Sequence, residues 1–245
     1  FITHAHGDHC FGIPGLISTL GMLGRNGDLV IHAPAHLEEY LHTIIKLFCQ
    51  GMPFQVRFNP VNPHEYGLVM EDRSVSVYSL PLKHRIPCCG YLFVEKQREA
   101  HIIREMIDFH HIPVKEIQYI KQGADYVTPE GKVIPNAWLT RPAALSRKYA
   151  YCSDTAYYPK ILPYIHRADL LYHEATFAEA DAARANETFH STARQAATIA
   201  RDAEVKQLLI GHYSARYEDL KPLHQEAKSI FPETLLAQEG MSLSL

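Results

Sequence analysis

The sequence predicts a single α/β domain in which strands and helices alternate along the chain. Short apolar runs of strand length recur between longer segments whose apolar residues follow the helical period, and this alternation is typical of α/β folds. With 245 residues and 47% hydrophobic content, the chain is long enough to bury one sizeable core or two smaller ones. No segment repeats another, and the 15 Pro and 13 Gly are scattered, which excludes collagen-like and low-complexity classes.

The first predicted elements are a strand end, two helices and a short strand. Residues 1–3 are expected to end a strand, and because a strand needs partners, we expect the natural protein to have a further N-terminal portion. The apolar run of residues 16–23 predicts a helix that has a Pro in its first turn and ends at Gly24. Residues 29–31 predict a buried strand, and Pro34 opens an amphipathic helix whose apolar residues share one face: Leu37, Leu41, Ile44, Ile45 and Phe48.

The next segment changes from the helical period to strands. Residues 54–82 are expected to form strands separated by turns at Asn62-Pro63 and Glu71-Asp72, and residues 91–94 predict one more strand. The stretch 95–148 is charged, rich in turn signals and contains a predicted helix over residues 100–109. We expect it to be a peripheral insertion, or arm, on the single domain.

Regular alternation resumes after the arm. Ser191 is the candidate N-cap of one of the helices. The predicted strands cover residues 149–152, 169–172 and 207–210, and the predicted helices cover residues 158–165, 191–203 and 220–230.

Composition excludes several classes of protein. The formal net charge is −3, so the overall charge of the chain does not indicate a nucleic-acid partner. No apolar run approaches the ~20 residues of a membrane span, and nothing resembles a secretory signal. The five Cys form no CxxC pair, which argues against a disulfide framework and favours the reducing cytoplasm. The chain contains 16 His, an unusually high number. This number indicates possible metal binding, because His is the commonest metal ligand in proteins.

A metal-binding pattern begins directly after the first expected strand. Residues 4–9 place three imidazoles and a carboxylate within six positions, as His-Ala-His-Gly-Asp-His. On an extended segment, His4 and His6 face the same way and can converge on one ion, while the following turn directs Asp8 and His9 elsewhere. Imidazole with carboxylate suits Zn²⁺, with Mn²⁺ or Fe²⁺ as alternatives.

Three further candidate ligands each lie just past the end of an expected strand. They are His84, Asp154 and His212. Ligands gather at the carboxyl ends of strands in α/β sheets, so the shared position supports all three. Asp154 is the best suited to bridge two cations, because a carboxylate has two oxygens and a negative charge.

These residues lie within motifs that resemble those of the metallo-β-lactamase superfamily and, more narrowly, of the ribonuclease Z family, whose members trim the 3′ end of precursor tRNA. The resemblance covers essentially the whole chain and implies an αββα sandwich whose first N-terminal strands precede Phe1. The matching motifs are His-Ala-His-Gly-Asp-His at 4–9, Ser-Asp-Thr at 153–155, His-Glu-Ala-Thr-Phe at 173–177, His-Ser-Thr-Ala at 190–193 and Gly-His-Tyr-Ser-Ala-Arg-Tyr at 211–217.

The resemblance implies a role for each site residue. One zinc ion would be held by His4, His6 and His84, and the other by Asp8, His9 and His212, with Asp154 bridging the two. Asp8 is also the expected proton acceptor. His190 would act at the leaving group, oriented by Glu174. His173 stays outside this set, because its ring can simply hydrogen-bond to backbone at a strand end.

The implied activity is hydrolysis of one phosphodiester in precursor tRNA, leaving a 3′-hydroxyl on the tRNA and a 5′-phosphate on the trailer. In the family, the arm grips the tRNA, often from the partner subunit of a homodimer. Here the basic and acidic residues of the arm are nearly balanced, which does not favour phosphate binding. Two alternatives remain open: a hydrolase of a small phosphodiester or ester, which a weakened arm favours, and an inactive metal-binding or RNA-binding module.

Overall fold

The computed structural model describes all 245 residues, from Phe1 to Leu245, and confirms the α/β class. Its contacts divide the chain into two compact units. The main unit consists of Phe1–Val94 and Arg147–Leu245, and the arm unit consists of Glu95–Ser146. The arm unit falls within the segment for which the sequence predicts a peripheral insertion.

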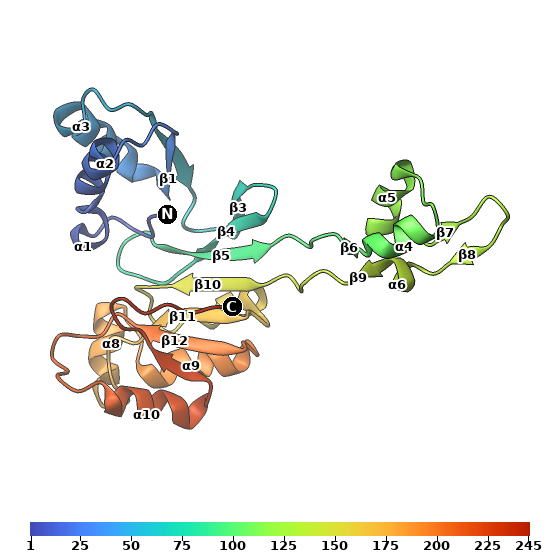
Figure 1. Cartoon of the computed structure of the whole chain (residues 1–245). Coiled ribbons are helices and arrows are strands. Elements are labelled where there is room, and N and C mark those ends of the chain that lie inside the picture. The colour runs from blue at the N-terminus through green and yellow to red at the C-terminus, as the bar shows by residue number, and fades with distance from the viewer. The chain divides into compact units, whose positions relative to one another are not determined.

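The main unit contains a seven-stranded sheet and a separate parallel pair of strands, β1 and β2 (Figure 1). The order across the large sheet is β13-β12-β11-β10-β5-β4-β3. Strands β10 to β13 run parallel, whereas β10 pairs antiparallel with β5. The strands are β1 (Leu29–Pro34), β2 (Val56–Val61), β3 (Gly67–Glu71), β4 (Val75–Pro81), β5 (Cys89–Glu95), β10 (Lys148–Cys152), β11 (Leu170–Glu174), β12 (Gln207–Gly211) and β13 (Thr234–Leu236).

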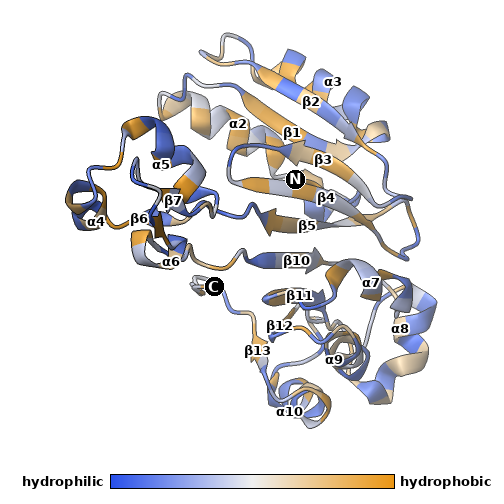
Figure 2. Ribbon diagram, turned by 90° about the vertical axis from the view of Figure 1, so that its right-hand side faces the viewer, coloured by the Kyte–Doolittle hydropathy of each residue, from blue (hydrophilic) through white to orange (hydrophobic).

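Helices cover the outer faces of these sheets (Figure 2). Three apolar clusters join the layers. One cluster packs α2 and α3 against β1, a second joins Val61 of β2 to β4 and β5, and the largest packs α7, α9 and α10 against the seven-stranded sheet. The helices are α1 (Gly7–Cys10), α2 (Ile13–Met22), α3 (Glu38–Phe48), α7 (Leu162–Ile165), α8 (Ala182–Thr188), α9 (Ala193–Asp202) and α10 (Lys221–Ile230), with 3-10 turns at Ala35–Leu37, Pro159–Ile161 and Glu179–Asp181.

The arm unit has a small apolar core of its own. Its buried side chains come from every helix of the unit and from two of its strands. These elements are β6 (His101–Ile102), α4 (Arg104–Phe109), α5 (Val114–Lys121), β7 (Tyr126–Val127), β8 (Val133–Ile134), α6 (Asn136–Leu139) and β9 (Thr140–Arg141). The expected helix over residues 100–109 is therefore shorter, because residues 101 and 102 pair with β9 instead.

Most predicted elements of the main unit are present, and two predictions are wrong. Residues 1–3 form no strand, because only single backbone bonds tie them to their neighbours: the Ile2 N–H donates to the His32 carbonyl and the Cys89 N–H to the Thr3 carbonyl. The N-cap of α9 is Thr192 and not Ser191, since the Thr192 side chain accepts from the backbone N–H of Gln195 in a capping box.

Two expectations from composition can also be compared with the structure. All five Cys are free and buried, so no disulfide is formed. None of the helices combines the length and apolar character that crossing a membrane requires.

The parallel strands bring distant residues to one edge of the sheet. Cys152 of β10 lies beside His173 of β11, which lies beside Ile210 of β12. The residues that follow these strands therefore emerge together. The loop after β4 reaches the same edge, because the Lys83 N–H donates to the Thr155 hydroxyl and the Ala156 N–H to the Lys83 carbonyl.

Candidate metal centre

The segment of residues 4–9 lies at this edge of the sheet. His4 and His6 belong to an extended stretch, and His6 is the N-cap residue of α1, which contains Asp8 and His9. The change from extended to helical backbone directs the two pairs of side chains to different places, as the sequence predicts.

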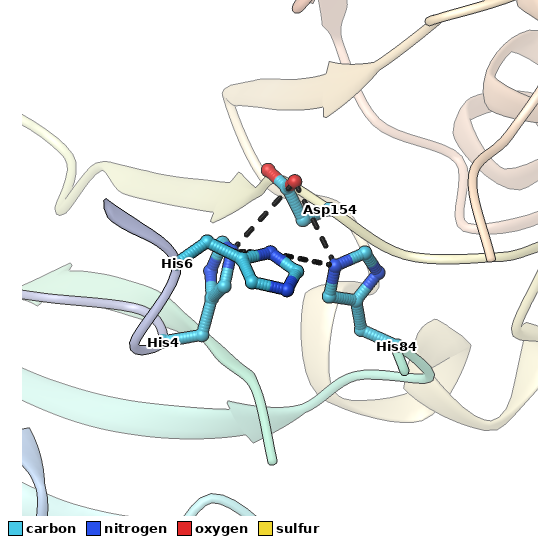
Figure 3. Close-up of side chains that lie close together, drawn as sticks. All are labelled: His4, His6, His84 and Asp154. Atoms are coloured by element: carbon cyan, nitrogen blue, oxygen red, sulfur yellow. Dashed lines mark hydrogen bonds and ion pairs between the residues drawn. The ribbon is translucent and has the colours of Figure 1, made fainter. Parts of the chain in front are cut away.

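A first group of donor atoms consists of His4, His6, His84 and Asp154, which come from three separate segments (Figure 3). The Nδ1 of His6 lies 3.0 Å from the Nε2 of His4 and 3.3 Å from the Nε2 of His84. The Asp154 Oδ2 lies 3.8 Å from His4 Nε2 and 3.9 Å from His84 Nε2. His4 and Asp154 are buried.

A second group lies on the other side of Asp154 and uses its other oxygen. The Asp154 Oδ1 lies 3.4 Å from His9 Nε2 and 3.5 Å from His212 Nε2. Asp8 completes this group, with its Oδ2 3.5 Å from His9 Nε2. Each carboxylate oxygen of Asp154 thus faces a different set of imidazoles, which is the arrangement of a bridging ligand.

The spacing of the donor atoms fits two small cations. A tetrahedral zinc ion with bonds of about 2.0–2.1 Å separates its ligand atoms by about 3.3–3.4 Å. The separations in the two groups run from 3.0 to 3.9 Å, so small shifts would bring the atoms to ligand positions. The structure therefore brings together all seven residues that the sequence suggests as ligands.

Hydrogen bonds on the far side of the rings hold three of the imidazoles in place. The Nδ1–H of His4 faces the Thr3 hydroxyl at 2.9 Å, and that of His84 faces the Phe189 carbonyl at 3.1 Å. His212 Nδ1–H faces the Thr176 hydroxyl at 2.9 Å. Such bonds fix the tautomer that leaves Nε2 free for a metal.

Strained backbone occurs at three points of the site. Asp154, His212 and Phe189 have φ values of 57°, 58° and 60°, in the left-handed region that non-glycine residues rarely adopt. Each such conformation costs about 1–3 kcal/mol and persists only where the surroundings impose it. At Phe189 it accompanies the carbonyl that accepts from His84.

Burial and charge set the protonation of the ligands. Burial lowers the pKa of His4 to about 3, and burial likewise lowers the pKa of His84. For Asp154, burial would raise the pKa, but His212, the Ser153 hydroxyl, His9 and His4 together lower it. Neutral imidazoles and an ionised carboxylate are the forms that bind metal.

Glu174 and the half-buried His190 form a hydrogen-bonded pair beside the second group. Glu174 is fully buried and accepts hydrogen bonds from the Thr155 N–H at 2.6 Å, the Ser191 N–H at 3.0 Å and the Thr176 hydroxyl at 2.6 Å. Its Oε1 also accepts from His190 Nδ1 at 2.8 Å. Burial would lower the pKa of His190, but the bond and charge of Glu174 outweigh it and raise that pKa.

His190 also reaches the candidate metal ligands. Its ring lies within the group formed with Asp154 and His212, and it stacks on His212 with ring centroids 5.3 Å apart. Its Nδ1 is bound to Glu174, so Nε2 is the ring nitrogen on the opposite side of that contact. The full burial of Glu174 excludes a role as an ordinary surface carboxylate.

Two further residues lie beside the site: His173, which belongs to neither donor group, and Thr176, which the sequence pattern did not suggest. His173 is fully buried and donates from Nδ1 to the Glu174 carbonyl at 2.7 Å, so it belongs to the end of β11 and not to either donor group. Thr176 was missed, although its hydroxyl contacts both Glu174 and His212. The only sequence signal for Thr176 is its place in the His-Glu-Ala-Thr-Phe motif.

Comparisons with curated proteins give a consistent result, although a scan against protein-family models found no match. The chain is 68% identical to ribonuclease Z of Parabacteroides distasonis and 58% identical to ribonuclease Z of Bacteroides thetaiotaomicron, in each case over 100% of this chain. The alignments cover 81% and 78% of the two relatives. Ribonuclease Z of Porphyromonas gingivalis is 54% identical over the same length.

Solved structures confirm the expected metallo-β-lactamase fold. The short form of human tRNase Z superposes with a TM-score of 0.64 at 25% identity, covering 100% of this chain and 77% of that one. The metallo-β-lactamase fold protein YhfI of Bacillus subtilis gives a TM-score of 0.63 at 18% identity, covering 98% of this chain and 74% of that one.

Proposed function

The chain belongs to the ribonuclease Z family, and on that premise we propose that it is a metal-dependent endoribonuclease that removes the 3′ trailer from precursor tRNA. The product tRNA keeps a 3′-hydroxyl, and the trailer leaves with a 5′-phosphate. The observation that supports this most strongly is the position of Asp154, whose two oxygens face two separate groups of imidazoles.

The proposed cofactor is a pair of zinc ions. His4, His6 and His84 would hold one ion, Asp8, His9 and His212 the other, and Asp154 both. A bound pair would supply Lewis-acid stabilisation of the charge on the phosphoryl oxygens and would lower the pKa of water towards neutrality. The donor set also suits Mn²⁺ and Fe²⁺.

His190 is the proposed proton donor to the departing 3′-oxygen of the tRNA. Hydrolysis needs a proton there, and a positioned general acid contributes typically 10²–10⁴-fold to a rate. Glu174 holds the imidazole by its Nδ1 and raises the pKa of the ring, which favours the protonated form, with Nε2 directed away from the carboxylate.

Asp8 is proposed as a metal ligand and as the acceptor of the proton released by the attacking water. Its side chain is 76% exposed and lies beside His9 at the solvent side of the pocket. A carboxylate in this position can pass a proton to bulk solvent, which a buried carboxylate cannot.

Further proposals concern the assembly and its location. Several apolar side chains are exposed on α2 and in the turns that flank it, including Phe11, Leu16, Met22 and Leu23. Such a surface is suited to an interface between two copies, which supports a homodimer. Five unpaired Cys support a reducing, cytoplasmic location.

A cleavage assay tests the function. The metal-loaded chain is incubated with a precursor tRNA that carries a 3′ trailer, and the ends of both products are analysed. We expect a single cut that gives a 3′-hydroxyl and a 5′-phosphate. Hydrolysis of bis(p-nitrophenyl) phosphate without cleavage of the precursor would favour the small-phosphodiester alternative, and no hydrolysis of either would favour the inactive module.

A further inference from the structure

A groove passes beside His84, a residue of the candidate metal centre whose side chain is 2% exposed. Its first part is a cavity of about 350 Å³ that also contains Arg85, Lys83, Pro87, His64 and Tyr158 on its walls. A second cavity of about 520 Å³ continues it, because His64 and Pro87 line both. No acidic residue lines either cavity.

We propose that this groove, called here the trailer groove, binds the single-stranded 3′ trailer through its phosphates, with Lys83 and Arg85 as the contacting side chains. The proposal rests on the proposed function and extends it to the part of the substrate that leaves.

Lys83 and Arg85 are suited to phosphate binding because no protein carboxylate neutralises them. Both side chains are exposed, and neither has an ion pair or a side-chain hydrogen bond in the structure. The backbone that presents them is fixed, since the Lys83 N–H donates to Thr155 and its carbonyl accepts from Ala156. Two unpaired cations on a rigid segment beside a site for phosphodiester cleavage are poised for the substrate backbone.

The lining of the groove, which lacks His190, favours the trailer over the tRNA body. His190 donates to the leaving 3′-oxygen, so the last nucleotide of the tRNA lies at His190. The phosphoryl group stays on the trailer. Neither His190 nor His212 lines the groove, although the His190 ring lies 5.2 Å from that of His84 and within reach of the charge of Arg85.

The size and chemistry of the groove also favour a single strand. Cavities of this volume accommodate groups of small-molecule size and cannot admit the acceptor stem, which is a wide A-form helix. Tyr158 offers an aromatic face on which a base can stack whatever its identity. Phosphate contacts and stacking are independent of sequence, as binding to variable trailers requires.

The test compares precursor tRNAs with the same body and trailers of one or about ten nucleotides, the longer being within the site sizes of single-strand binders. Each phosphate contact to a single strand contributes a salt slope of about 0.7, which is about fivefold in affinity between about 1 M and 0.1 M salt. Lys83→Ala and Arg85→Ala should therefore each raise KM about fivefold more for the long trailer than for the short one at low salt. Lys228→Ala, an exposed lysine on α10, is the matched control and should change neither KM.

A binding measurement separates this effect from turnover. Fluorescence anisotropy follows binding of a 5′-phosphorylated single-stranded RNA of about ten nucleotides, again within the site sizes of single-strand binders, at several salt concentrations. Lys83→Ala and Arg85→Ala should each reduce the salt slope by about 0.7, while Arg85→Lys and Lys228→Ala should retain it. Unchanged metal content in each variant excludes indirect damage at His84.

The outcomes are distinguishable. If the wild-type chain cleaves no precursor, the proposed function fails. If it cleaves precursors but KM rises equally for short and long trailers in the variants, or does not rise at all, the trailer groove is refuted and the proposed function stands.

Discussion

Replacing Glu174 with Gln is the sharpest test of the hydrogen bond between Glu174 and His190. The substitution keeps the shape of the side chain and removes its charge. Oε1 accepts from the Thr155 N–H and from His190, and Oε2 accepts from the Ser191 N–H, the Thr176 N–H and the Thr176 hydroxyl. A Gln presents an NH₂ group at one of these two positions, so at least two donors lose their acceptor whichever way the amide is turned.

The magnitude follows from those two donors. Each buried donor left without a partner costs about 1–3 kcal/mol, so Glu174→Gln should lower the free energy of unfolding by about 2–6 kcal/mol. Urea denaturation of the metal-free chain measures this loss. Glu187→Gln, at an exposed position of α8, is the control and should change stability little.

The same variant should alter the pH dependence of cleavage. In the wild-type chain, burial lowers the pKa of His190 and Glu174 raises it further than burial lowers it. The protonated donor is therefore present below this raised pKa, and kcat should fall as the pH rises through it. In Glu174→Gln the pKa of His190 should drop, and the alkaline limb of the kcat profile should move to lower pH.

The free energy of unfolding should depend on pH in the same direction as kcat. Because the folded-state pKa of His190 is raised, the pair contributes stability that is fully present below the unfolded pKa of about 6.5 and is lost as the pH rises through the folded value. A Glu174→Gln variant that unfolds within about 1 kcal/mol of wild type, below the cost of one buried unpaired donor, and keeps its alkaline limb would refute this reasoning.

Two other variants should behave in predictable ways. His190→Ala should reduce kcat by about 10²–10⁴-fold and leave metal content unchanged, as cleavage assays and metal analysis will show; loss of metal would instead make His190 a ligand. Asp169→Asn should lower the free energy of unfolding by about 1–2 kcal/mol near neutral pH, because Asp169 accepts from the Lys148 N–H at 2.7 Å and from Lys206 at 2.6 Å. Burial would raise the pKa of Asp169, but these partners outweigh it and lower the pKa. The contribution of Asp169 to the free energy of unfolding is therefore present above the unfolded pKa of about 3.9 and is lost as the pH falls through the folded value. A loss of stability in Asp169→Asn that persists in acid would contradict the assignment.

Sequence reasoning located the donor groups because strand ends are predictable. His84, Asp154 and His212 follow strands whose carboxyl ends share one edge, and the apolar pattern of strands is visible in the sequence. Position in an α/β sheet therefore converts a one-dimensional spacing into a three-dimensional cluster.

Contacts made by backbone and small hydroxyls were not predictable in the same way. Phe189 acts through a carbonyl in a left-handed conformation, and Thr176 through one hydroxyl. Neither a Phe nor a Thr in the sequence indicates such a role. The N-cap of α9 was within reach, because Thr192 and Gln195 have the spacing of a capping box.

The short strand expected at residues 1–3 failed for another reason. An apolar tripeptide cannot be distinguished by pattern from an extended segment that makes single bonds to two neighbours. The boundaries of elements in the arm unit were also missed, because four of its strands have only two residues each.

Anomalous diffraction from crystals grown with zinc tests the central claim most directly. The arrangement around Asp154 predicts two zinc peaks about 3.5–4 Å apart, one on the side of His84 and the other on the side of His212, each coordinated by one oxygen of the bridging carboxylate. A single peak, or peaks whose coordination omits Asp154, would contradict a binuclear centre in this protein.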